Sequence, residues 1–170
     1  PDDLDPELMV QRRPAQVTFG GIAVDVPVGA FLQPSAQGEA LLVAEVTAAL
    51  ADATRVADLY AGCGAFTFAL AGSASVRAVE GVAAMADAIT GAAGRAGLAD
   101  KVTADSRDLE RLPLLADELT GYDAVVFDPP RAGARRQAEA LAVSAVPVVV
   151  AVSCHPGSFA RDARALVDGG

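Results

Sequence analysis

Short apolar runs alternate along most of the chain with stretches in which apolar residues recur at helical spacing. The apolar runs predict five strands, at residues 55–60, 76–80, 101–105, 124–127 and 147–152. A helical stretch follows each of the first four, and a last helix is expected over residues 158–167. Because strands that alternate with helices form βαβ units, this order predicts a parallel sheet that is buried on both faces. The predicted fold class is therefore α/β, with a doubly wound, mainly parallel sheet.

Two further elements are expected ahead of these units. Residues 17–19 and 22–24 flank a Gly-Gly pair, a pattern typical of a two-residue β-hairpin turn. Ser35 is a candidate N-cap for a helix over residues 35–50, where leucine and valine recur at helical spacing.

Composition excludes several classes of protein. The chain has 170 residues, 52% hydrophobic and 21% charged, which is enough for one core and argues against a disordered or collagen-like chain. No apolar run approaches the ~20 residues that cross a bilayer, so we expect no membrane association. Two cysteines are too few for a disulfide framework and favour a reducing, cytoplasmic setting. The net charge of −9 does not by itself indicate a nucleic-acid partner.

A glycine-rich turn follows the first of the five strands. Gly62 and Gly64 permit a sharp turn and close approach of a ligand, and Glu80 ends the next strand, where a carboxylate can accept two hydrogen bonds from a ribose diol. A dinucleotide is a rival ligand, although the third glycine of its fingerprint is missing. Asp58 ahead of the turn would repel phosphate and attract a cation, which favours the sulfonium compound S-adenosylmethionine. A plain strand-to-helix turn is the alternative.

A carboxylate and a stiff turn end the fourth strand. Two prolines follow Asp128, and because they fix φ at about −65° and lack N–H donors, the loop can hold this carboxylate toward a substrate or donor. In amino-methylating enzymes a related loop with an aromatic residue orients an amine, but here Arg131 takes that place. With Arg135 and Arg136 it forms a basic cluster suited to binding a phosphate of the substrate. The alternative for the last two is a solvated, charged helix start.

Cys154 directly follows the fifth strand and faces the start of the last helix. The helix dipole and its free N–H groups stabilise a thiolate, the nucleophilic form of cysteine. His155 is a candidate to support that thiolate or to contact the substrate. An inert, buried thiol is the alternative. Cys63 lies within the glycine turn and is expected to be structural; the ends of its strand and of the fifth strand should lie about 10 Å apart, too far for a disulfide.

Taken together, these segments resemble the RNA uracil-C5 methyltransferases, the family that makes 5-methyluridine in transfer and ribosomal RNA. The resemblance covers nearly the whole chain from about Phe31 onward and is carried by residues 31–33, 58–64, 79–81, 128–133 and 152–162. It implies a Rossmann-like class I methyltransferase domain that uses S-adenosylmethionine, acts on RNA and needs no metal. It also implies Cys154 as the nucleophile and a set of residues around the donor, to which the turn glycines belong: Gln33, Tyr60, Gly62, Gly64, Glu80, Asp108 and Asp128.

The sequence departs from the family pattern at several positions. The family commonly has Asn at the positions of Ser35, Ala65 and His155, and Cys at that of Ala61, so one donor contact is expected to be lost. We expect residues 1–170 to form the catalytic domain alone, as a monomer, with residues 1–30 as a short hairpin segment.

Parts that family members carry are expected to be missing from this chain. They are the N-terminal RNA-binding and central domains, the last strands of the sheet, and a C-terminal Glu that serves as general base. The segment should therefore bind the donor but not turn over. The alternatives are a methyltransferase for another nucleobase position or a small molecule, and a non-catalytic nucleotide-binding domain.

Overall fold

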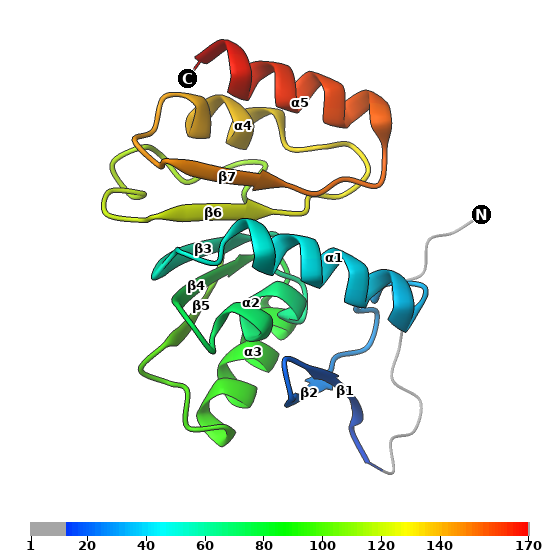
Figure 1. The fold of residues 1–170 in the computed structure, drawn as a ribbon. Helices are drawn as coiled ribbons and strands as arrows, with labels where there is room; N and C mark the ends of the chain where they lie inside the picture. The colour runs from blue at the N-terminus through cyan, green and yellow to red at the C-terminus, as the bar shows by residue number, and fades with distance from the viewer. Residues whose placement is uncertain (1–12, 170) are drawn as a thin grey trace, which may run out of the picture.

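The structure, a computed structural model, describes residues 13–169 and is built around a five-stranded parallel sheet (Figure 1). Its strands lie in the order β5 (Val102–Ser106), β4 (Ser75–Glu80), β3 (Arg55–Leu59), β6 (Ala124–Phe127) and β7 (Val148–Ala151). The chain runs outward from β3 to β5 and then returns to the other side of β3 at β6. The sheet therefore has a switch point between β3 and β6, where doubly wound folds bind ligands. The predicted α/β fold is confirmed.

Helices cover both faces of this sheet. On one face lie α1 (Ala36–Ala49), α2 (Ala65–Leu70) and α3 (Ala83–Arg95), and on the other lie α4 (Arg135–Ala142) and α5 (Pro156–Gly169) (Figure 1). Neighbouring strand residues alternate between the two cores, so that Val56 and Val126 pack on the α1 side, whereas Leu59 and Phe127 pack on the α4 side. The central strands are therefore buried on both faces, as expected for a parallel sheet.

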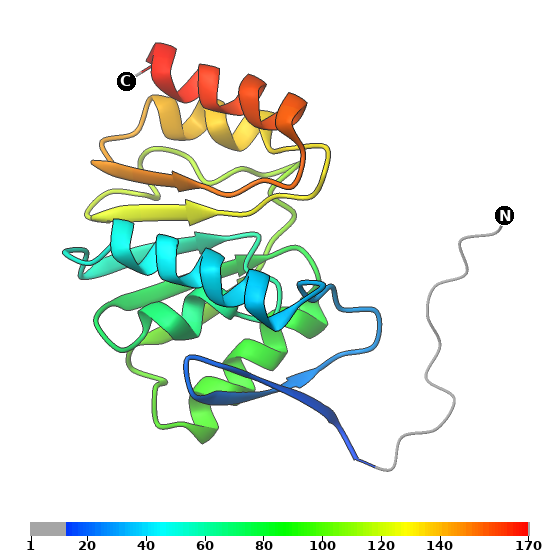
Figure 2. The same cartoon turned by 45° about the vertical axis from the view of Figure 1, so that its right-hand side comes forward.

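The predicted hairpin is confirmed. Strands β1 (Ala15–Phe19) and β2 (Ile22–Val26) pair antiparallel, and the two glycines between them have φ of +53° and +82°, which a tight hairpin turn requires. Figure 2 shows the hairpin, in blue, lying against α3. Its buried Phe19 and Val24 share a core with that helix, and Asp25 pairs with Arg95 at 3.1 Å. The hairpin thereby anchors the segment that leads to α1.

The connection between β5 and β6 is not the helix that the sequence predicted. Residues 107–123 form a series of turns, because Pro113 lacks an N–H donor and Arg107 binds the backbone oxygens of Leu112 and Pro113 at 2.7 Å each. The Arg107 guanidinium also pairs with Glu118 at 2.5 Å. The last helix begins at Pro156, earlier than expected, because proline is favoured in a first helical turn.

Candidate active site

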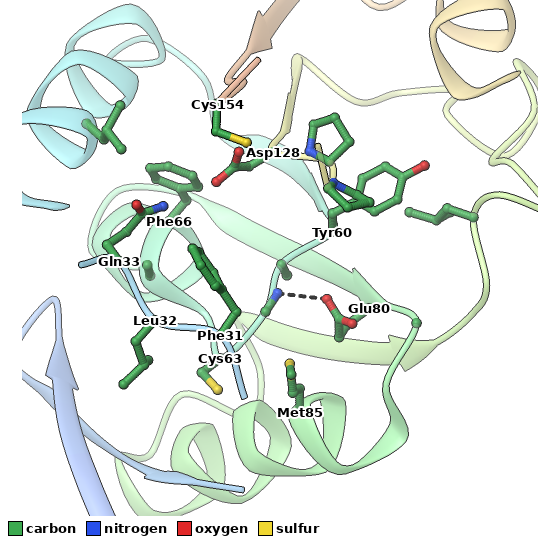
Figure 3. A pocket seen from close by; sticks show the side chains of 18 of the residues that line it. Phe31, Leu32, Gln33, Tyr60, Cys63, Phe66, Glu80, Met85, Asp128 and Cys154 are labelled. Carbon is green, nitrogen blue, oxygen red and sulfur yellow. Dashed lines mark hydrogen bonds between the residues drawn. The ribbon is translucent and has the colours of Figure 1, made fainter. Parts of the chain in front are cut away.

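The carboxyl ends of the central strands border a cavity of about 620 Å³, a volume typical of small-molecule sites (Figure 3). Eight of the ten site residues predicted from the sequence line this one cavity. They are Gln33, Tyr60, Gly62, Glu80, Asp108, Asp128, Arg131 and Cys154. The parallel sheet is the reason, because it brings residues that follow β3, β4, β6 and β7 to the same edge.

The other two predicted residues, Gly64 and His155, lie outside the cavity lining. A side chain at Gly64, where φ is +93°, would meet Phe68 at 2.9 Å and Ile89 at 3.2 Å, so this glycine lets α2 pack closely. The Nδ1 atom of His155 accepts a hydrogen bond from the Ser158 N–H at 3.2 Å, in the first turn of α5. Both residues therefore have structural contacts, and their predicted ligand contacts stay predictions.

The carboxylate of Glu80 is held in place by the glycine turn. Its two oxygens accept hydrogen bonds from the N–H groups of Gly62 at 2.8 Å and Val82 at 2.9 Å. A side chain at Gly62 would meet nothing within 4 Å, so this face of the turn is open to a ligand. Because the Gly62 N–H already serves Glu80, it is not free to bind a pyrophosphate, which argues against a dinucleotide.

Tyr60 occupies the strained position between β3 and the turn. Its φ of +60° is uncommon for a residue other than glycine and is a form of strain that concentrates at functional sites. The phenol donates a hydrogen bond to Glu110 at 3.1 Å, and burial, together with the charge of Glu110, raises the pKa of Tyr60. The ring is thus fixed as a neutral wall of the cavity. Glu110, which also lines the cavity, was missed by the sequence analysis.

Much of the cavity wall is apolar and was not assigned from the sequence. Met85 and Leu109 line it beside Glu80 and Asp108, and Phe31 lines it from the segment before α1. Phe31 is 71% exposed, which is unusual for an aromatic side chain and leaves its ring available to a ligand. Residues 31–33 carried part of the family resemblance, but an apolar wall assembled from three distant segments has no local sequence signal.

Asp128 and Cys154 meet where β6 and β7 end. The strands are held in register by the bond from the Val152 N–H to the Phe127 oxygen at 2.9 Å, and Figure 3 shows the thiol and the carboxylate lying close together at one side of the cavity. Burial raises the pKa of Asp128. Cys154 is exposed and Cys63 is buried, and both are free thiols. Since burial, with the charge of Glu80, raises the pKa of Cys63, only Cys154 is suited to react with a ligand.

The relatives of the chain are RNA methyltransferases. It is 47% identical over 167 residues to an uncharacterised RNA methyltransferase of Mesorhizobium japonicum, covering 98% of this chain and 40% of that protein. It is 44% identical over 146 residues to the 23S rRNA uracil-C5 methyltransferase RlmD of Chromohalobacter salexigens, covering 84% of this chain and 30% of that protein. Over nearly its whole length the chain is homologous to proteins named RNA methyltransferases, and RlmD among them is a uracil-C5 methyltransferase. The chain spans about 40% of the length of the first of these relatives.

A solved structure supports the methyltransferase fold. The Pyrococcus abyssi tRNA (uracil-54, C5)-methyltransferase in complex with S-adenosyl-L-homocysteine matches this homologue with a TM-score of 0.76 and 22% identity, over 90% of this chain and 38% of that one. This likeness confirms the predicted Rossmann-like class I fold. No protein-family model matches the chain.

Two classes of feature are absent from the described part of this methyltransferase homologue. Within residues 13–169, no helix combines the length and apolar character that a membrane crossing needs. Over the same residues, no group of three or more His, Cys, Asp or Glu side chains is placed to hold a metal ion.

Asp58 does not reach the cavity, which corrects the expectation that it attracts a cationic ligand there. Strand alternation turns its side chain toward α2, where it is 1% exposed and accepts a hydrogen bond from the Thr67 hydroxyl at 2.5 Å. Its other oxygen has no hydrogen-bond partner in the described chain. Burial, opposed in part by Thr67, raises the pKa of Asp58 to about 7. In this methyltransferase homologue Asp58 thus connects β3 to α2, the two elements on either side of the glycine turn.

The Asp58→Asn variant should flatten the pH dependence of folding stability. Because the pKa of Asp58 rises from 3.8 to about 7 on folding, its stabilising contribution is complete below pH 3.8 and is lost as pH rises through about 7. Urea unfolding measures the free energy of unfolding of the variant minus that of wild type. This difference should be more favourable to the variant at about pH 8 than at about pH 5. An equal difference at both pH values would contradict the assignment.

A polar face of α5 holds the loop that carries Asp128 and Arg131. The Ser158 hydroxyl donates to the Arg131 oxygen at 3.0 Å, and the Arg161 guanidinium donates to the Ala132 oxygen at 2.9 Å. Asp162, which is 4% exposed, accepts the Ala134 N–H at 2.7 Å. Since α5 follows Cys154 directly, these bonds place the loop relative to the thiol.

The Asp162→Asn variant should lose about 2 kcal/mol of folding stability, because it weakens a buried, charge-assisted hydrogen bond and an ion pair with Arg161. Asp168→Asn is the matched control on the same helix, since Asp168 pairs with Arg164 at the surface, and should lose less than about 0.5 kcal/mol. Urea unfolding of both variants measures the difference, and equal losses would show that the buried contact does not secure the loop.

Proposed function

We propose that this chain is the catalytic segment of an S-adenosylmethionine-dependent methyltransferase that modifies C5 of a uridine in ribosomal or transfer RNA. One observation carries the proposal: an exposed thiol, Cys154, and a strand-end carboxylate, Glu80, open onto the same cavity in a homologue of RNA methyltransferases. A reactive free thiol also fits the reducing cytoplasm expected from the cysteine count.

The cavity suits the donor in each of its parts. Glu80 keeps lone pairs free for the ribose hydroxyls, and Met85 and Leu109 offer an apolar slot beside it for a planar base. Asp128 and Asp108 supply negative charge for the amino acid part, whose ammonium lies close to the sulfonium. Among residues 13–169, the lining contains five carboxylates and one cationic side chain, Arg131, which favours a cationic ligand over a phosphate ester.

Uracil C5 is a poor carbon nucleophile, and Cys154 can change that. The thiolate adds to C6, which breaks the C5–C6 double bond and makes C5 an enolate-like carbon. S-adenosylmethionine supplies the electrophilic methyl group, which this carbon takes while the sulfonium sulphur keeps the electron pair of the broken bond. A base must then remove the C5 proton, after which the C5–C6 double bond forms again and the Cys154 thiolate leaves.

The walls of the cavity align the two partners for methyl transfer. The Glu80 contacts fix the donor, and α5 fixes the Asp128 loop beside Cys154, so that alignment supplies much of the rate. The target base has to leave its stack to enter. We expect residues 1–170 by themselves to perform addition and methyl transfer without multiple turnover, because the family's base, a C-terminal Glu, matches no residue of this chain.

Two measurements on the chain test the proposal. Calorimetry should show S-adenosylhomocysteine binding with micromolar affinity while NADH does not bind. RNA that contains 5-fluorouridine, incubated with S-adenosylmethionine, should form a covalent complex on a denaturing gel, since fluorine at C5 leaves no proton for a base to remove. Donor binding without an adduct would favour a methyltransferase for another position, and binding of neither would favour a non-catalytic domain.

A further inference from the structure

Three exposed arginines belong to segments that line the cavity or contact its lining: Arg131, Arg111 and Arg136. Arg131 lines the cavity after β6, and Glu110, from the turns after β5, lines it as well. Arg136, in the first turn of α4, donates hydrogen bonds to the backbone oxygens of Glu110 at 3.0 Å and Arg111 at 3.1 Å. This bridge holds the Arg136 guanidinium against the backbone of residues 110 and 111, next to the cavity lining. We call these three residues the arginine rim.

The rim arginines lack the carboxylate partner that most other arginines of residues 13–169 have. Arg13 and Arg55 also lack one, and the Arg55 guanidinium lies 4.4 Å from the centroid of the Tyr122 ring. Six arginines have a carboxylate partner within 4 Å: Arg77, Arg95, Arg107, Arg135, Arg161 and Arg164. The three rim residues are exposed, and among residues 13–169 none of them has such a partner. Arg135, which the sequence placed in the basic cluster, is paired with Glu139 at 2.9 Å and does not belong to the rim.

The charge of the cavity wall indicates which part of a nucleic acid, the base or the phosphate, the rim would bind. Inside the mouth the lining carries the carboxylates of Glu39, Glu80, Asp108, Glu110 and Asp128. These groups repel phosphate and admit a neutral base, whereas guanidinium groups bind phosphate bidentately. A nucleotide that places its base in the cavity therefore keeps its phosphates outside, where exposed guanidinium groups can bind them.

We propose that the arginine rim is a phosphate-binding surface that holds the RNA backbone next to the target nucleotide. The inference rests on the proposed function, since RNA is the partner that brings a neutral base and a charged backbone to one place. Phosphate contacts position a nucleic acid without reading its sequence, so the rim sets the register of the strand. Selection of a particular uridine is not expected from it.

Salt-dependent RNA binding tests the rim. Fluorescence anisotropy of the chain with a single-stranded, uridine-containing RNA of about ten nucleotides should give a linear fall of log affinity with log salt concentration. In the Arg111→Gln/Arg136→Gln variant the slope should fall by about one to two, and affinity at low salt should fall about tenfold. Arg111→Gln alone should show part of the loss. Among residues 13–169, the hydrogen bonds of Arg111 are made by its backbone and not by its side chain, so the substitution should leave the fold intact.

A matched control removes the same charge elsewhere. Lys101 is exposed and precedes β5, at the opposite edge of the sheet from the cavity, so Lys101→Gln, the control for Arg111→Gln, should keep the wild-type slope. Arg136→Lys, which retains the charge, should keep most of the affinity. Three results would each overturn the proposal that the rim binds phosphate. They are equal slopes for the rim and control variants, no salt-dependent binding by wild type, and binding of polyglutamate as tight as that of RNA.

The outcome is separable from the proposed function. If the rim variants lose RNA affinity but wild type forms no 5-fluorouridine adduct, the rim stands and the uracil chemistry fails. If an adduct forms at equal RNA concentrations in wild type and rim variants, the chemistry stands and the rim fails. S-adenosylhomocysteine binding should be unchanged in Arg111→Gln, because Arg111 meets Arg136 through its backbone oxygen and not through its side chain.

Discussion

Replacing Cys154 with alanine should abolish the covalent complex with 5-fluorouridine RNA and slow methyl transfer to uridine at least about a thousandfold. The reason is that Cys154 is the exposed thiol of the cavity. Cys63, the second free thiol, lies within the glycine turn and also borders the cavity, but it is 4% exposed and burial raises its pKa, so it is not suited to add to C6. The adduct is measured on denaturing gels over time at saturating RNA and donor.

Matched variants separate chemistry from folding. Cys63→Ala should form the adduct at close to the wild-type rate, and Cys154→Ala should bind S-adenosylhomocysteine as wild type does, because its small, exposed side chain contributes little to the core. If Cys154→Ala keeps wild-type methylation in a protein that turns over, the thiol is incidental and the methyl group goes to another position.

The Glu80→Gln variant should lower the affinity for S-adenosylhomocysteine about 10- to 100-fold, which corresponds to about 1.4–2.7 kcal/mol. An amide nitrogen cannot accept the N–H bond of Gly62 or Val82, so one anchor of the side chain is lost together with the charge that strengthens hydrogen bonds from ribose hydroxyls. Calorimetry measures the change, and at saturating donor the rate of adduct formation should recover.

Glu45→Gln serves as the control for this variant. Glu45 is an exposed residue of α1, so its substitution removes the same charge without touching the cavity lining. Its donor affinity should stay within about twofold of wild type. A Glu80→Gln affinity equally close to wild type would show that the donor does not bind at the glycine turn.

The fold and the polar residues of the site could be predicted from the sequence for a physical reason. In a parallel sheet, binding and catalytic residues lie at the carboxyl ends of the strands. In the sequence these ends are marked by short apolar runs that stop at polar or glycine residues. Glu80, Asp128 and Cys154 each stand at such a point, and the structure brings all three to one cavity. Their roles in binding and catalysis stay predictions.

Other features depend on contacts between distant segments. The turns of residues 107–123 replace a predicted helix because the Arg107 side chain binds backbone oxygens, which no local spacing announces. The rim assembles because Arg136 reaches across to residues 110 and 111. Asp58 is a different case, since strand alternation with the neighbouring Leu59 could have shown that it faces α2 and not the ligand.

The central claim is that the Cys154 sulphur and the bound methyl donor lie within reach of one pyrimidine ring. Tandem mass spectrometry of the adduct formed with 5-fluorouridine RNA and S-adenosylmethionine tests it most directly. We predict a single modified nucleotide, joined through its C6 atom to the Cys154 peptide and carrying one donor-derived methyl group on C5. A cross-link to a different residue, or a Cys154 cross-link whose nucleotide has gained no methyl group, would contradict the account.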